Sequence, residues 1–191
     1  MLITRDRISE YLTAVVAAFP HAGRLYLVGE TSQLFTGWRE WVEAIEVAGE
    51  VAPEHSGELS ETIHSVAVRL GVEVIEESPA DVIPLPVGYE ERAIPIETPA
   101  GPLRLFHFDP YSVAYRFIAR GDEPDYHLVL MYLRHGWLHM SELDSRLTDL
   151  LPRFTSETIQ QDPAEFRRRY KGLKQMAEAV SPRTIHRHTR A

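Results

Sequence analysis

Apolar residues recur along this chain with two different periods, and the change between them marks the predicted elements. In the first half, stripes with apolar residues three or four positions apart indicate amphipathic helices. Short apolar runs between the stripes indicate buried strands. The predicted helices cover 6–19, 31–35 and 58–70, and the predicted strands cover 25–28, 41–47 and 72–75. The polar stretch 49–57 is predicted to be a loop.

The middle of the chain is rich in proline and is predicted to run extended over 78–92. Two further strands are predicted at 93–97 and 103–108, joined by a hairpin-like turn. Pro95 lies in the first of them and has no N–H to donate to a neighbouring strand. That strand is therefore expected at a sheet edge.

From Asp109 onward the pattern is helical. Asp109 followed by Pro110 is typical of a helix start, with the aspartate as N-cap. Further helices are predicted after Asp122, from a capping-box-like pair formed by Ser141 and Asp144, and over 166–180. The residues 182–191 are predicted to be a polar tail.

The order of elements predicts an α/β (α+β) fold, a mixed sheet with flanking helices followed by a helical C-terminal half. The predicted division places the α/β core at 1–108, the helical region at 109–181 and the tail at 182–191.

Composition narrows the functional classes. The chain has 191 residues and no cysteine, which excludes disulfides and cysteine-based metal sites. Its formal net charge of −8 disfavours a nonspecific nucleic-acid binder. The N-terminus lacks an apolar signal-peptide run, and no apolar stretch is long enough for a membrane span. A cytoplasmic protein without membrane partners is expected.

The chain resembles the minimal nucleotidyltransferase superfamily, in the branch near the AbiEii and MenA-type toxins. The strand and glycine LYLVG at 25–29 match the start of that branch's motif, and its DID triplet aligns with Ala44-Ile45-Glu46. Two downstream segments, 83–92 and 115–125, resemble its "plPxGYExR" and "lKLxAxRxKDxxD" elements. The resemblance spans 25–125 and implies a nucleotidyltransferase-like core.

The resemblance also implies a set of site residues. Members of the family bind Mg²⁺ through converging carboxylates. Here Glu46 is the candidate metal ligand, Glu73 and Glu76 are candidates for the additional catalytic carboxylate, and Ala44 replaces the first metal-binding aspartate. The candidates for substrate binding are Gly29, Glu30, Arg39, Arg92, Arg116 and Arg120.

Two of these positions depart from the family pattern. Glu30 replaces a small residue at the place where phosphates are cradled, and its carboxylate would repel them. Ala44 supplies no ligand atom. Alternatively, Glu46 is a solvated acid at a strand end. For Arg116 and Arg120, with Arg92, the alternative is salt bridges to the nearby acidic residues Asp122, Glu123 and Asp125.

Some other polar and aromatic residues have two interpretations. His107 and Asp109 are either a ligand pair, or Asp109 serves as a helix cap. The run Arg167-Arg168-Arg169 is either a solvated helix face or a contact for tRNA or another nucleic acid. Trp38 and Trp41 either fill the nucleotide site or pack in an ordinary core.

Three functions follow as expectations. The first is a catalytically impaired or dead relative that acts as a binding or regulatory module. The second is an active Mg²⁺-dependent transferase that moves NMP from an NTP to an RNA, protein or small-molecule hydroxyl. The third is an interaction protein, such as one partner of a toxin–antitoxin pair. The expected partners are accordingly a nucleotide or another protein.

Overall fold

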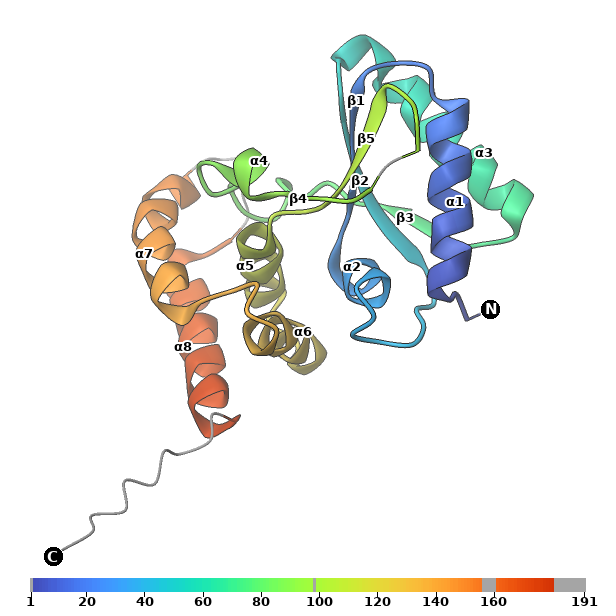
Figure 1. Ribbon diagram of the computed structural model, residues 1–191. Coiled ribbons are helices and arrows are strands. Elements are labelled where there is room, and N and C mark those ends of the chain that lie inside the picture. The colour runs from blue at the N-terminus through green and yellow to red at the C-terminus, as the bar shows by residue number, and fades with distance from the viewer. Residues whose placement is uncertain (1, 98, 156–160, 181–191) are drawn as a thin grey trace, which may run out of the picture.

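The computed structural model describes residues 2–97, 99–155 and 161–180. It is a mixed α/β structure in which a twisted sheet is followed by a helical C-terminal half. In Figure 1, α1 and α3 lie against one side of the sheet, and the later helices lie on the other side. The predicted tail at 182–191 lies outside the described residues.

The sheet has five strands in the order β3-β2-β1-β5-β4. Parallel pairing joins β1 to β5 and β2 to β3, and antiparallel pairing joins β1 to β2 and β4 to β5. The strands are β1 (Gly23–Leu27), β2 (Ile45–Val51), β3 (Val74–Glu76), β4 (Ile94–Pro95) and β5 (Leu103–His107). The central β1 is flanked on both sides, and β4, which contains Pro95, is an edge strand as predicted.

Two helices cover the first face of the sheet. They are α1 (Arg5–Ala18) and α3 (Ser56–Leu70), and α3 follows the 3₁₀ turn η1 (Pro53–His55). The hydrophobic core between these helices and the sheet includes Leu25, Ile45 and Leu105. These residues alternate with side chains that face the other side, as the two-residue period of a strand requires.

The helical half packs on the second face. In its core, the strand residues Tyr26 and Ala48, together with Val28 just after β1, pack against the interiors of the later helices. The remaining helices are α2 (Gly29–Phe35), α4 (Tyr89–Arg92), α5 (Pro110–Arg120), α6 (Glu123–Arg134), α7 (Met140–Leu150), the 3₁₀ turn η2 (Leu151–Thr155) and α8 (Pro163–Val180). One sheet thus stands between two hydrophobic layers.

The N-cap predicted at Asp109 is confirmed. Its carboxylate accepts hydrogen bonds from the backbone N–H groups of Tyr111 (3.2 Å) and Ser112 (3.3 Å). Asp122 is also the N-cap residue of α6, although its side chain makes no capping hydrogen bond. The start predicted from Ser141 is wrong, because α7 begins at Met140 after His139.

The strand predicted at 41–47 is displaced. β2 begins at Ile45 and continues through Gly49 and Glu50, where a loop was predicted, and Val42 forms only an isolated bridge with Ile3. Gly49 pairs with Leu25 and Glu50 with Arg24 on β1. Pairing with β1 therefore sets the length of this strand, and its polar, glycine-containing composition does not end it.

Candidate functional site

The turn after β1 is built around Gly29. This residue begins α2 with φ +53°, a left-handed conformation that glycine adopts without strain. A Cβ atom at this position would lie 2.4 Å from an Oε atom of Glu46. Gly29 is therefore required both by the turn and by the close approach of the neighbouring carboxylate.

Glu46 lies on β2 and reaches across to the N-terminus of α2. Its carboxylate accepts a hydrogen bond from the Glu30 N–H at 3.1 Å, and its own N–H donates to Thr31 Oγ1 at 2.7 Å. Burial, followed by the negative charge of Glu77, raises the pKa of Glu46 to about 7. At neutral pH the side chain thus carries a proton in about half of the molecules.

The other acidic candidates lie in or beside β3. Glu76 pairs in register with Val47, so its side chain lies on the opposite face from Glu46, where it accepts a hydrogen bond from Ser60 Oγ at 2.6 Å. Glu73 is exposed. The neighbouring carboxylate whose charge acts on Glu46 is instead that of Glu77, which the sequence reasoning missed. Because Ile75 pairs with Glu46, the two-residue period places both Glu73 and Glu77 on the face of Glu46 once the register is known.

The four candidate arginines are all paired with acidic side chains of the chain itself. Arg92 donates two hydrogen bonds to the fully buried Asp109, at 2.9 and 2.7 Å. The Nε atom of Arg120 lies 3.1 Å from an Oδ atom of Asp125. Arg39 pairs with Glu30, and Arg116 pairs with Glu77. Salt bridges were predicted here, but of the predicted partners only Asp125 is confirmed, with Arg120; Arg92 and Arg116 pair with Asp109 and Glu77 instead.

Aromatic side chains from the helical half pack over the turn. Trp38 stacks on His135 with ring centroids 4.1 Å apart and meets Tyr132 and Trp137 edge-on. The Tyr132 hydroxyl donates a hydrogen bond to the Gly29 carbonyl at 3.2 Å. This cluster fills the space between α2 and the loop after α6.

A buried serine–histidine pair lies behind the turn and was not predicted. Ser32 Oγ and His107 Nδ1 are 2.7 Å apart, and burial lowers the pKa of His107 to about 4. The imidazole is therefore neutral at pH 7. Ser32 is buried, and its hydroxyl is already engaged with the ring of His107. His107 and Asp109 do not form a ligand pair, since Asp109 caps α5 and holds Arg92.

A pocket of about 430 Å³ opens beside the turn, between α2 and α6. Gln33 forms part of its lining together with Glu30, Arg39 and His127. The Gln33 side chain is fully buried, and its Nε2 donates to the Leu128 carbonyl at 3.2 Å. Its Oε1 accepts no hydrogen bond from any described residue.

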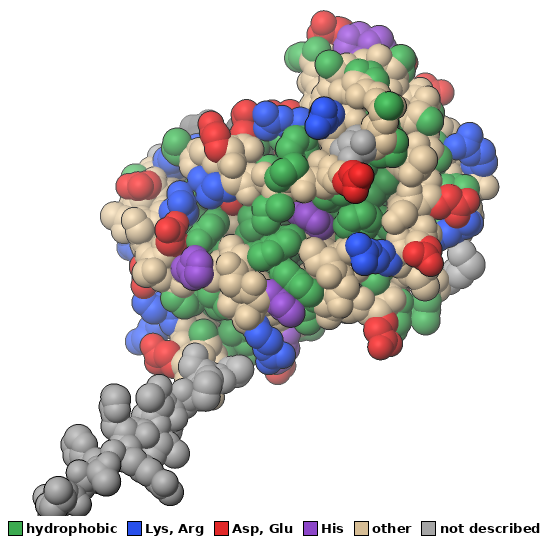
Figure 2. Space-filling model, in the orientation of Figure 1, with side chains coloured by type: hydrophobic (Ala, Val, Ile, Leu, Met, Phe, Trp, Pro, Cys, Tyr) green, Lys and Arg blue, Asp and Glu red, His purple; other side chains and the backbone are tan. Residues whose placement is uncertain are grey.

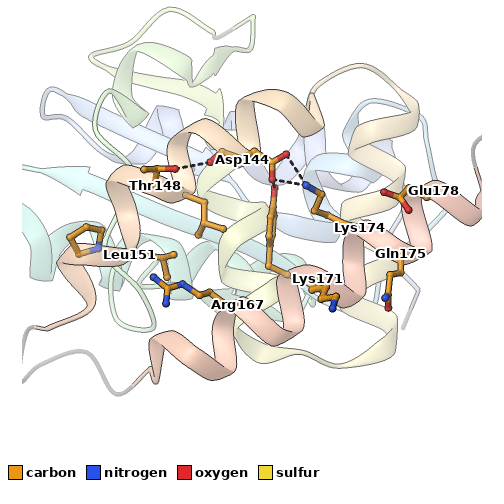
Figure 3. A pocket seen from close by; sticks show the side chains of 11 residues that line it. Asp144, Thr148, Leu151, Arg167, Lys171, Lys174, Gln175 and Glu178 are labelled. Carbon is orange, nitrogen blue, oxygen red and sulfur yellow. Dashed lines mark hydrogen bonds and ion pairs between the residues drawn. The ribbon is translucent and has the colours of Figure 1, made fainter.

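A second pocket, of about 830 Å³, lies between α7 and α8 (Figure 3). Figure 3 shows Arg167, Lys171 and Lys174 projecting from α8 along this pocket. Lys174 is held by Asp144, with both oxygens at 2.9 Å. Of the predicted basic run, Arg168 and Arg169 both pair with Glu165. Ion pairing thus takes up much of the positive charge of α8.

A third pocket, of about 670 Å³, lies beside β4. It is lined by Phe35, Ile94, His107 and Trp137, with Arg5 among the few charged residues. Figure 2 shows hydrophobic side chains gathered along the middle of the molecule, with charged side chains around them.

Comparisons of the chain with protein-family models, with curated proteins and with solved structures found no match. No helix in the described part of the chain is long and apolar enough to cross a membrane. The function must therefore be inferred from the geometry around Gly29 and Glu46.

Proposed function

We propose that this chain is a nucleotidyltransferase-like binding module that does not carry out nucleotidyl transfer. One observation carries the proposal. The Glu46 carboxylate accepts the N–H of Glu30 at the start of α2, where a bound phosphate would need that donor. The site supplies its own hydrogen-bond acceptor in place of a phosphate oxygen.

The surrounding charges support the same conclusion. A triphosphate needs uncompensated positive charge, and each of the candidate arginines is already paired with a carboxylate. Both Glu30 and Glu46 place acidic groups at the turn. Like charges at such short range oppose the binding of a polyphosphate.

Few observations support the binding of a metal ion by Glu46. Mg²⁺ is held by several oxygen ligands that converge on the ion. Among the described residues, Glu46 belongs to no group of three acidic or histidine side chains with ligand atoms in mutual reach. Ala44 contributes none, and Glu76 lies on the other face of the sheet.

The pocket between α2 and α6 is the proposed binding site. Its volume of about 430 Å³ is within the ordinary range for small ligands. Gln33 Oε1 offers a buried acceptor without a partner among the described residues, which suits a ligand with an N–H donor such as a nucleobase amine. Arg39 and Glu30 at the same pocket provide a polar rim. The ligand class is therefore a nucleoside or nucleobase without a polyphosphate.

Thermal-shift titration tests this proposal. Nucleosides and nucleotides are compared with and without Mg²⁺ or Mn²⁺, and labelled NTPs are used to detect transfer products. We expect stabilisation by at least one nucleoside, loss of that stabilisation in Gln33→Met, and no metal-dependent stabilisation by NTPs. His64→Ala, on the outer face of α3, is the matched control. Absence of any nucleoside effect, or transfer that Glu46→Gln abolishes, would overturn the proposal.

The alternative of an active transferase has one observation in its favour. A carboxyl with a pKa of about 7 in a partly buried site is suited to act as a general base toward a hydroxyl. In that case Glu46→Gln abolishes transfer while Glu77→Gln only weakens it. An interaction protein is the second alternative, supported by the pocket beside β4 with its apolar residues Phe35, Ile94 and Trp137. Co-purification of a partner protein that is lost in Trp137→Asp would favour it.

A further inference from the structure

Three potential metal ligands meet beside the start of β1 and the end of β2, at the opposite end of these strands from the Gly29 turn. His21 lies in the turn between α1 and β1, His55 ends η1, and Glu58 lies in the first turn of α3. The two chain segments meet here because the start of β1 pairs with the end of β2, with Gly23 opposite Val51. Within the described residues, this is the one group of three histidine or acidic side chains whose ligand atoms all lie within 4.8 Å of one another.

The three side chains of the group lie in contact with one another. His21 Nε2 lies 3.0 Å from an Oε atom of Glu58. The rings of His21 and His55 stack with centroids 3.6 Å apart and planes 8° from parallel. Phe19 packs edge-on against His21 with centroids 5.5 Å apart, which restricts that ring. Both imidazoles are thereby held beside one carboxylate.

We propose that His21, His55 and Glu58 bind a divalent transition metal ion of the Zn²⁺ class, with water as a fourth ligand. Two imidazole nitrogens and one carboxylate oxygen form a donor set preferred by Zn²⁺, Co²⁺ and Ni²⁺ over Mg²⁺. A neutral imidazole offers the lone pair that such a metal requires.

Side-chain rotations are required to complete the site. An imidazole binds a metal in the plane of its ring, so the two nearly parallel rings must turn out of their stack to direct both lone pairs at one ion. With metal–ligand distances of about 2.0–2.1 Å, tetrahedral ligand atoms lie roughly 3.3 Å apart, and here they lie within 4.8 Å of one another. We expect metal binding to replace the ring stacking, because the His21 and Glu58 side chains are 33% and 49% accessible and have room to rotate.

A metal at this site links the turn before β1 to the start of α3. It joins two segments that are distant in sequence but pack beside the same strand pair. The ion therefore acts as a structural clip, and this role does not depend on the function proposed for the Gly29 turn.

The test is titration of chelator-treated, tag-free protein with Zn²⁺ and Co²⁺. His186 and His188 in the C-terminal segment offer further imidazoles, so all measurements use the background H186A/H188A. We expect one ion per chain by calorimetry, tetrahedral Co²⁺ absorption bands, and a rise in Tm with saturating Zn²⁺. His55→Ala and Glu58→Gln should each weaken binding at least tenfold.

His64→Ala is the matched control, because His64 also faces a glutamate, Glu76 at 3.5 Å, but belongs to no group of three potential ligands among the described residues. The affinity of the His64→Ala variant for Zn²⁺ should match that of the background protein H186A/H188A. The Tm of the metal-free protein and its circular dichroism establish whether each variant is folded. If His55→Ala does not fold, Glu58→Gln alone tests the site. No saturable binding, or binding that survives both His55→Ala and Glu58→Gln, would overturn the proposal.

Discussion

Replacing Glu46 by glutamine should stabilise the protein, and the gain should depend on pH. The glutamine side chain keeps an oxygen that accepts the Glu30 N–H but carries no ionisable group. In the wild type, burial and the charge of Glu77 raise the pKa of Glu46 from 4.5 to about 7. The folded protein thus holds a proton that the unfolded chain releases between these two values.

The sign follows from proton binding. Between pH 4.5 and about 7 the folded state binds more protons than the unfolded state, so stability falls as pH rises through this window. The shift of roughly 2.5 pKa units corresponds to about 3 kcal/mol at most. Because Glu46 is only partly buried, we expect Glu46→Gln to raise the free energy of unfolding by about 2 kcal/mol at pH 8. At pH 4.5 the difference should vanish.

Urea denaturation of both proteins across pH 4.5 to 8 measures this difference. For a chain of this size, about 2 kcal/mol corresponds to a rise in Tm of roughly 4–8 °C. Subtracting wild type from variant cancels the titration of groups that the substitution leaves unchanged. If Glu46→Gln destabilises the protein at pH 8, the ionised carboxylate is a stabilising partner, and the raised pKa of Glu46 is refuted.

Three other substitutions probe the surroundings of the turn. Arg92→Ala leaves the fully buried carboxylate of Asp109 without its charge partner and should lower the free energy of unfolding in urea by about 3–5 kcal/mol. Arg168→Ala removes one partner of an exposed ion pair and should change it by less than about 0.5 kcal/mol. Equal effects of the two substitutions would contradict the importance of burial. Gly29→Ala should cost about 1–3 kcal/mol, and combining it with Glu46→Ala should recover only part of the loss, because the left-handed φ remains. The pKa of His107 is lowered from 6.5 to about 4, so wild-type stability from this group is present above pH 6.5 and is lost as pH falls toward 4; His107→Gln should remove that acid sensitivity, and an unchanged pH profile would exclude it.

Local chemistry could be predicted from the sequence. Asp109-Pro110 predicted a helix start because an N-cap acts on the two or three residues that follow it, and the structure places the carboxylate on those N–H groups. Pro95 predicted an edge strand because it lacks a donor. The apolar period of two or of three to four predicted most helices and strands and the mixed α/β class with a helical C-terminal half.

Features that depend on strand register could not be predicted in this way. The extent of β2 is set by its pairing with β1, so a polar stretch with Gly49 that looks like a loop became strand. Register with β3 then decides that Glu77, and not Glu76, acts on Glu46. A shift of one residue moves every side chain to the other face, which is why the choice among neighbouring acids required the structure.

The sequence by itself determined where most elements lie, which residues cap them, and which charged and histidine side chains are available. The tertiary structure alone decided their partners. Arg116 pairs with Glu77, and His21 meets His55 and Glu58, across distances in sequence that no local pattern encodes. The physical reason is that secondary structure follows from interactions within a few residues, whereas the electrostatic state of a side chain follows from the groups that folding brings within a few ångströms of it.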